Sequence, residues 1–131
     1  MNDKARFIKK RKHARDKALQ ALYQWQLSAE ELDWIRDHYL EDQGVAAGDE
    51  EYFLELLYQI PPQVAELDSI FLKFVEKFED RLDPIEASIL RIATYELLNH
   101  PEIPYKVVMA LTTATSLLMV YSIPSAHSCV S

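Results

Sequence analysis

The sequence predicts an all-α fold, a compact domain of about five to six helices. Apolar residues recur at intervals of three and four residues over most of the chain, which is the spacing of one helix face. The 131 residues include only two glycines, too few for the many tight turns of a β-sandwich. Aspartate, serine and proline stand between the periodic stretches, where helices begin and end.

The first helix is expected to begin near Ala14 and to end at Leu27. Tyr23 falls on the side of the helical wheel that continues the basic residues before the helix, so we expect it to be exposed. The opposite, buried face consists of small and apolar residues: Ala14, Ala18, Ala21, Leu22 and Trp25.

The next two helices are predicted from their caps. Ser28 and Glu31 have the spacing of a capping box, so a second helix should begin there and end before Gly44. Asp49 should cap a third helix, which Pro61-Pro62 ends. The apolar faces of these two helices are Leu32, Ile35, Tyr39 and Leu40, and then Tyr52, Phe53, Leu56, Leu57 and Ile60.

Two further helices follow. The fourth carries apolar residues at helical spacing over about four turns: Val64, Leu67, Ile70, Phe71, Phe74, Val75 and Phe78. The fifth should have Asp83 as its cap and Pro84 at its first position, and should reach Asn99. Its buried face consists of Ile85, Ile89, Ile92 and Ala93.

Glu96 lies within the apolar face of the fifth helix. A buried carboxylate requires a partner, and Arg15 or Tyr105 could supply one. A general acid or a contact to another protein is the alternative role. Because no second catalytic group stands nearby in the sequence, we interpret Glu96 as an internal anchor.

The chain changes character near its end. Pro104-Tyr105-Lys106 should open a sixth helix, and residues 107–131 contain no charged side chain. The apolar run over 107–123 is 17 residues long and contains several hydroxyl groups, so it is too short and too polar for a membrane span.

Charge is distributed unevenly. Residues 1–17 contain eight Lys and Arg against two Asp, a net charge of +6, whereas the whole chain carries −7. A basic segment on an acidic domain indicates a polyanionic partner. A nucleic acid is favoured over a lipid surface because the segment lacks a wide apolar face of its own, and over mere solvation because an exposed Tyr23 could stack on an unpaired base.

Several kinds of chemistry find no support. The four histidines and Cys129 form no H-x-x-x-H or C-x-x-C pair, so we expect no metal, no cofactor, no catalytic residue and no enzymatic activity. A single cysteine and the lack of a secretory signal favour the cytoplasm.

Three stretches together resemble the NusB family of bacterial transcription antitermination factors, over about residues 9–108. They occur in the order and spacing of the family: Arg15 with Ala-Leu-Gln-Ala-Leu-Tyr-Gln-Trp-Gln-Leu over 18–27, Glu86 with Ile-Leu-Arg-Ile-Ala-Thr-Tyr-Glu-Leu over 89–97, and Ile-Pro-Tyr-Lys-Val-Val over 103–108. The resemblance implies an all-helical RNA-binding factor. Such a factor binds the boxA segment of nascent ribosomal RNA transcripts together with a small-subunit ribosomal protein, called NusE in this role, in the RNA polymerase antitermination complex.

The resemblance also implies roles for particular residues. Phosphate contacts fall to five basic residues: Lys9, Lys10, Arg11, Lys12 and Arg15. Tyr23 would support base contact, and Glu86 and Arg91 would lie near the partner protein.

We therefore divide the chain into a basic N-terminal arm (1–13), a NusB-like helical RNA-binding domain (14–108) and an uncharged divergent tail (109–131) that lacks the family's closing helix. Two alternatives remain open at this point. The chain could be the RNA-binding accessory domain of a ribosomal-RNA methyltransferase, or an inactive truncated copy that serves only as an interaction module. A homodimer is also left open.

Overall fold

The computed structural model describes residues 3–41, 50–73, 83–106 and 108–109. Over these residues the chain forms only helices, which confirms the all-α prediction. In order they are α1 (Asp3–Leu27), α2 (Leu32–Glu41), α3 (Glu50–Gln59), a 3-10 turn η1 (Pro61–Gln63), α4 (Val64–Phe71) and α5 (Pro84–Asn99).

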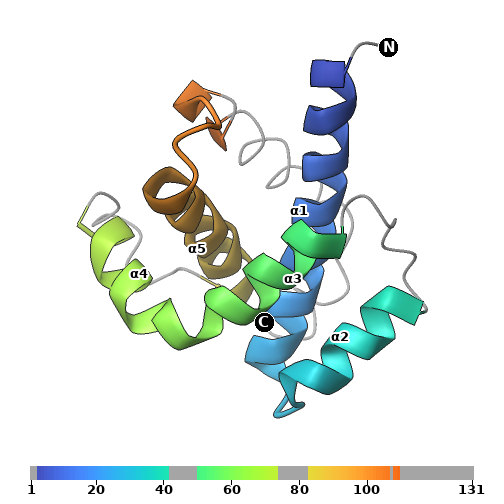
Figure 1. Cartoon of the computed structure of the whole chain (residues 1–131). Coiled ribbons are helices and arrows are strands. Elements are labelled where there is room, and N and C mark those ends of the chain that lie inside the picture. The colour runs from blue at the N-terminus through green and yellow to red at the C-terminus, as the bar shows by residue number, and fades with distance from the viewer. Residues whose placement is uncertain (1–2, 42–49, 74–82, 107, 110–131) are drawn as a thin grey trace.

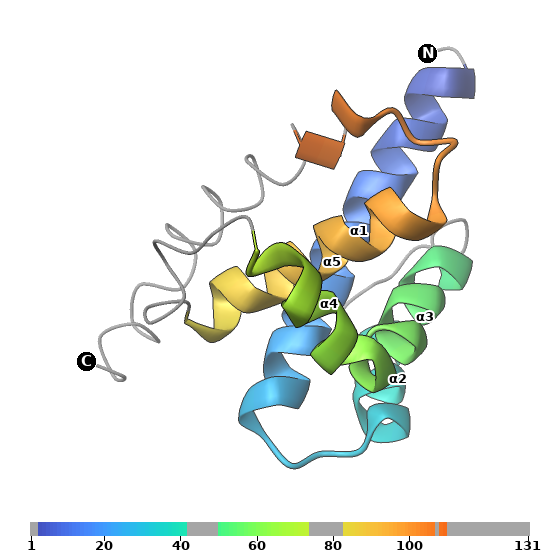
Figure 2. The ribbon, with the colours of Figure 1, turned by 90° about the vertical axis from the view of Figure 1, so that its left-hand side faces the viewer.

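The long helix α1 is central to the arrangement. Helices α2, α3 and α5 all pack against it, and α4 packs against α5 (Figure 1). The N-terminal end of α1 extends beyond the end of α3 in both views (Figure 2). The first turns of α1 are therefore the part of the helix that is most accessible to a partner.

Small residues let the other helices approach α1 closely. Ala14, Ala18 and Ala21 are fully buried, as the sequence predicts, and Leu22 is buried beside them. Trp25 is half-buried and packs against the same core. Larger core residues come from every helix, and those of α3 and α5 include Phe53, Leu56, Leu57, Ile85, Ile89 and Ile92. Complete burial of one such side chain contributes about 1.5–3 kcal/mol.

The first helix begins earlier than expected, at Asp3 instead of near Ala14. The apolar pattern that marks a helix only starts at Ala14, but lysine and arginine are also good helix formers, and no glycine or proline interrupts residues 3–27. Asp3 in the first turn also complements the helix dipole. The basic segment is thus part of a continuous helix.

The cap predicted at Ser28 is wrong in its details. The Ser28 hydroxyl donates to the Gln24 carbonyl oxygen at 2.8 Å, so it bonds back to the end of α1. Helix α2 begins only at Leu32, where the Ile35 amide donates to the Glu31 carbonyl oxygen. A serine between two helices can bond to the end of the first or cap the second, and spacing alone does not decide between them.

The predictions for the third and fifth helices are confirmed where the structure describes the chain, whereas α4 ends at Phe71, short of the four turns predicted for it, and Leu72 and Lys73 form a turn. Asp83 caps α5, because its carboxylate accepts the Glu86 amide at 2.9 Å, and Pro84 stands in the first turn. The predicted faces of α2, α3 and α5 pack into the core, as do Leu67 and Phe71 of α4. A sixth helix opens at Tyr105, and the Val108 amide donates to the Pro104 carbonyl oxygen at 3.2 Å.

Some predictions lie outside the described residues. They concern Gly44, the Asp49 cap, three apolar residues predicted to continue the fourth helix (Phe74, Val75 and Phe78) and the tail beyond Met109. Within the described ranges, none of the helices is long and apolar enough to cross a bilayer.

Candidate nucleic-acid interface

Four basic side chains lie on the outer side of α1. Arg6, Lys10 and Lys17 are separated by four and seven residues, which places them on one side of a helix, and Lys9 lies beside them. Arg6, Lys9 and Lys10 are exposed, and Lys17 is partly exposed. None of the four forms an ion pair with another residue that the structure describes. We call Arg6, Lys9, Lys10 and Lys17 the basic face.

Lys12 lies at the border of the basic face and already has a partner. Its ammonium group is 3.1 Å from the Asp16 carboxylate, with 38% of the Lys12 side chain exposed. Surface pairs at this spacing stabilise a helix by only about 0.3–0.5 kcal/mol. Lys12 can therefore exchange Asp16 for a phosphate at little cost.

Arg11, which the resemblance assigns to a phosphate, packs inward. Its guanidinium carbon lies 3.9 Å from the centre of the Tyr52 ring on α3 and 4.9 Å from that of Phe7. Its Nη1 is buried and has no hydrogen-bond partner among the described residues. Arg11 thus contributes a cation–π contact within the domain.

Arg15 is also directed inward. Its side chain is only 2% exposed, and Nε donates to Oε1 of Glu96 on α5 at 2.8 Å. Oε2 of Glu96 accepts the Tyr52 hydroxyl at 2.6 Å. The structure therefore identifies Arg15 as the partner of Glu96 and confirms that Glu96 is an internal anchor, whereas Tyr105, the other candidate, is 65% exposed.

The same contacts control the ionisation of Tyr52. Burial, together with the charge and the hydrogen bond of Glu96, raises the pKa of the Tyr52 phenol well above its usual value. Tyr52 therefore retains its proton and remains a hydrogen-bond donor to Glu96 at neutral pH.

Tyr23 is half-buried and packs against the core, where the sequence predicts an exposed ring. Leu19, which precedes it by one turn on the same side of α1, is 1% exposed. The buried side of α1 is thus wider than the apolar pattern indicates, and it includes part of the Tyr23 side chain.

The two residues assigned to the partner protein lie in different environments. Glu86 is exposed in the first turn of α5. Arg91 instead holds Asp68 of α4 with two parallel hydrogen bonds, from Nε and Nη2, each 2.8 Å long. Its Nη1 donates to Oε1 of Gln26 on α1 at 2.7 Å. Arg91 therefore links α5 to α4 and α1 through hydrogen bonds.

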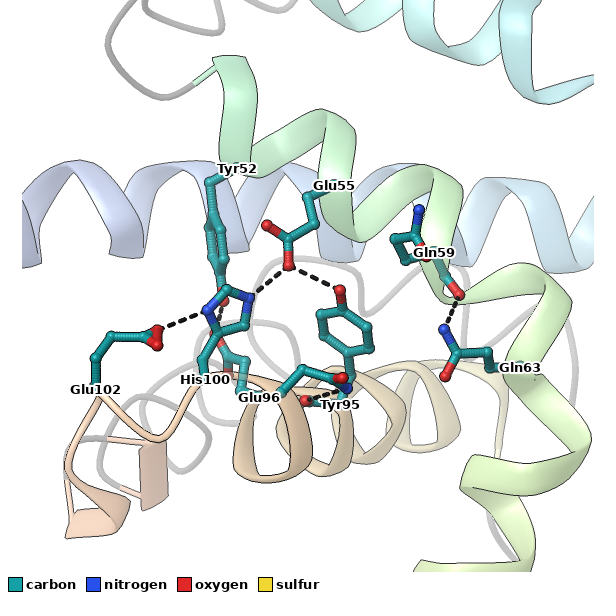
Figure 3. A network of polar contacts seen from close by, with 9 residues as sticks. Tyr52, Glu55, Gln59, Gln63, Tyr95, Glu96, His100 and Glu102 are labelled. Carbon is teal, nitrogen blue, oxygen red and sulfur yellow. Dashed lines mark hydrogen bonds and ion pairs between the residues drawn. The ribbon is translucent and has the colours of Figure 1, made fainter.

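A second polar cluster, which the sequence does not predict, surrounds His100 at the end of α5 (Figure 3). Its Nε2 lies 2.5 Å from Oε2 of Glu55, and its Nδ1 lies 2.6 Å from Oε2 of Glu102. The Tyr95 hydroxyl donates to the same Glu55 oxygen at 2.7 Å. These bonds connect α3 to the end of α5.

The cluster shifts the ionisation of two of its members. Burial and the hydrogen bond to Glu55 raise the pKa of Tyr95. Burial acts to raise the pKa of Glu102, but the hydrogen bond from His100 and the nearby positive charges outweigh it, so the net shift is downward.

The sequence predictions omitted Arg6 and Lys17 from the phosphate contacts. Extending the helical period of α1 through the basic segment places them beside Lys10, so the signal was present. In the part of the chain that the structure describes, no three His, Cys, Asp or Glu side chains are arranged to hold a metal ion.

Comparisons with known proteins agree on one family. The model of the NusB family matches residues 12–128, a stretch that continues past the motifs ending at Val108. Three similar proteins are each named transcription antitermination protein NusB. That of Pseudoalteromonas atlantica is 42% identical, over 76% of this chain and 71% of its own. That of Shewanella pealeana is 38% identical over 92% and 87%, and that of Legionella pneumophila (strain Corby) is 41% identical over 78% and 69%.

Proposed function

The chain belongs to the NusB family, and we propose from this premise that it is a cytoplasmic transcription antitermination factor that binds single-stranded RNA. The RNA is a boxA-type sequence of nascent ribosomal RNA transcripts. A small-subunit ribosomal protein in the NusE role binds alongside, within the RNA polymerase antitermination complex. The proposed function includes no catalytic step.

The basic face is the observation that carries this proposal. Arg6, Lys9, Lys10 and Lys17 share one side of a rigid helix in a protein whose net charge is −7. From Arg6 to Lys17 the helix rises by roughly 16 Å, a length over which a nucleic-acid strand presents several phosphates. Because these four cations form no ion pair with another described residue, they give up no such pair when they bind a phosphate.

The proposed phosphate contacts differ from those that the family resemblance implies. Lys9, Lys10 and Lys12 remain proposed phosphate contacts, and Arg6 and Lys17 join them. Arg11 and Arg15 are left out because their guanidinium groups are engaged inside the domain. Tyr23 is retained as a base contact through the part of its ring that is exposed.

The partner protein is proposed to strengthen the modest affinity of this chain for RNA. Two proteins that bind the same RNA and each other increase one another's effective concentration, so the assembly is tighter than either contact alone. Glu86 is the proposed partner contact, because it is exposed in the first turn of α5. Arg91 would act through the position of α5, since its guanidinium group is occupied by Asp68 and Gln26.

A binding titration tests the proposal. A labelled boxA-type RNA and a scrambled RNA are titrated with the whole chain at two salt concentrations, with and without the ribosomal protein. We expect binding that prefers boxA, weakens with salt and tightens with the partner. The double variant Lys9→Ala/Lys10→Ala should lose at least about tenfold in affinity.

A matched variant controls for the loss of charge. Arg36→Ala/Lys73→Ala removes one positive charge from α2 and one from the turn after α4, both outside the basic face, and should bind as the unchanged chain does. Equal losses in the two double variants, or binding that is insensitive to salt, would refute the basic face as the RNA contact.

A further inference from the structure

We propose that Tyr52 and Glu96 are positioning residues for RNA binding, an inference that rests on the proposed function. They form a buried seat, which we define as the Tyr52 ring and hydroxyl together with the Glu96 carboxylate. Two arginines of α1 rest on this seat and fix the rotation of the helix about its own axis. The rotation in turn decides which side chains of α1 face outward.

The geometry joins both arginines to one pair of residues. The Arg15 Nε donates to Oε1 of Glu96 at 2.8 Å, and the Tyr52 hydroxyl donates to Oε2 of the same carboxylate at 2.6 Å. One turn earlier, the Arg11 guanidinium lies 3.9 Å from the centre of the Tyr52 ring. The seat therefore contacts α1 at two points on the same side, four residues apart.

Apolar packing and the buried ion pair both act on the rotation of α1. The face of α1 that meets the core contains three alanines, Ala14, Ala18 and Ala21, together with the buried Leu19 and Leu22. A buried ion pair is more demanding, because a shift by one residue turns the helix by about 100° and would leave Glu96 charged, buried and unpaired. The seat thus disfavours other rotations strongly.

His100 also contacts the seat. The His100 ring meets the Tyr52 ring edge-on, with centroids 5.3 Å apart and planes at 80° (Figure 3). His100 also contacts Glu55 of α3 and Glu102 beyond α5. These contacts of His100 therefore help to fix Tyr52 of α3 and Glu96 of α5 relative to each other.

Residue type separates the inner basic side chains from the outer ones. Both side chains on the seat are arginines, whose planar guanidinium groups can stack on a ring or fork onto a carboxylate. The basic face consists mainly of lysines, which act as flexible point charges suited to phosphates. The two sets therefore match two tasks, one of positioning and one of contact.

Substitution of Arg11 by lysine tests the inference without a change in charge. If Arg11 contacts RNA, Arg11→Lys retains most of the affinity. If Arg11 positions α1, lysine cannot stack on Tyr52 in the same way, and we expect affinity to fall about fivefold. Arg36→Lys on α2 is the matched control and should bind normally. An affinity of Arg11→Lys equal to that of the unchanged chain would overturn the inference.

Tyrosine variants test the seat itself. Tyr52→Leu removes the ring and the hydroxyl, whereas Tyr52→Phe keeps the ring. We expect Tyr52→Leu to lose about tenfold in affinity and Tyr52→Phe to recover most of that loss. The dependence of log Kd on log salt should also become shallower in Tyr52→Leu, because fewer phosphates are contacted at once.

Tyr39→Leu distinguishes positioning from loss of stability. Tyr39 on α2 is a buried tyrosine that packs against Phe53, and its removal should destabilise the core similarly. RNA binding is measured under conditions where circular dichroism shows each variant folded. Equal effects of Tyr39→Leu and Tyr52→Leu on affinity and salt dependence would show that the seat is only structural. If Lys9→Ala/Lys10→Ala also binds normally, the proposed function fails as well.

Discussion

Nε of Arg15 lies 2.8 Å from Oε1 of Glu96, a residue 81 positions further along the chain, and each of the two side chains is only 2% exposed. The pair joins α1 to α5. Charges this deeply buried do not by themselves indicate a large net gain in stability, because desolvation opposes the attraction. The removal of one partner, however, leaves the other charge buried and uncompensated.

Glu96→Ala should therefore lower the free energy of unfolding by about 3–5 kcal/mol. Urea unfolding followed by circular dichroism measures the change. The double variant Arg15→Met/Glu96→Ala should cost less than the sum of the two single variants, because it removes both charges together. If the losses of the two single variants simply add up in the double variant, the two side chains do not depend on each other for stability.

Alkaline pH should weaken the fold through Tyr52. Burial and Glu96 raise the pKa of Tyr52 above the value near 10 expected for an unfolded chain. The stabilisation linked to its proton is thus complete below pH of about 10 and is lost as the pH rises further. Tyr52→Phe has no proton to lose, so its free energy of unfolding should fall less between about pH 9 and 11 than that of the unchanged chain.

Urea unfolding at several pH values tests this expectation. Tyr39 and Tyr95, whose pKa values are also raised by burial, are present in both proteins, so the difference between the two isolates Tyr52. Parallel curves for the unchanged chain and Tyr52→Phe over this range would contradict the proposed environment of the phenol.

Arg91 should stabilise the fold through its forked contact with Asp68. The Arg91 side chain is 12% exposed and makes two 2.8 Å bonds to that carboxylate. A bidentate ion pair with little exposure stabilises a fold by more than the usual surface pair does. Arg91→Ala should therefore lower the free energy of unfolding by about 1–3 kcal/mol, and Arg91→Lys should recover only part of that loss. Arg36→Ala, which removes a more exposed ion pair on α2, should change the urea midpoint little.

Most of the fold follows from local pattern. The faces of α3 and α5 are apolar at helical spacing, and Asp83-Pro84 marks the start of α5 unambiguously. The start of α1 does not follow in the same way, because Lys9 and Lys10 carry helix propensity without an apolar period. A boundary inferred from the apolar pattern alone is therefore placed too late.

The site is less predictable because it depends on which neighbours a helix meets. Lys10 and Arg11 are adjacent in a single basic run, yet one is exposed and the other lies over the Tyr52 ring. Arg11 stands seven residues, about two turns, before the buried Ala18 and so lies on the side of α1 that meets α3, whereas Lys10 is turned about 100° away from it. Glu96 was identified from its apolar surroundings because a buried carboxylate requires a partner wherever the other helices lie.

The number of phosphates that α1 contacts should be visible in the salt dependence of RNA binding. Single-stranded RNA gives a slope of log Kobs against log salt of about −0.7 for each neutralised phosphate. If all eight basic residues of the first seventeen contacted RNA, the slope would be steeper than about −5.

With Arg11 and Arg15 engaged internally, the basic face, Lys12 and the exposed Lys4 can neutralise about four to six phosphates, so we expect a slope of about −3 to −4. Titrations at several salt concentrations give the slope, and Lys10→Ala should reduce its magnitude by about 0.7. A slope of −5 or steeper would mean that the inner arginines leave their contacts to bind RNA, and a slope near zero would exclude a phosphate-binding role for α1.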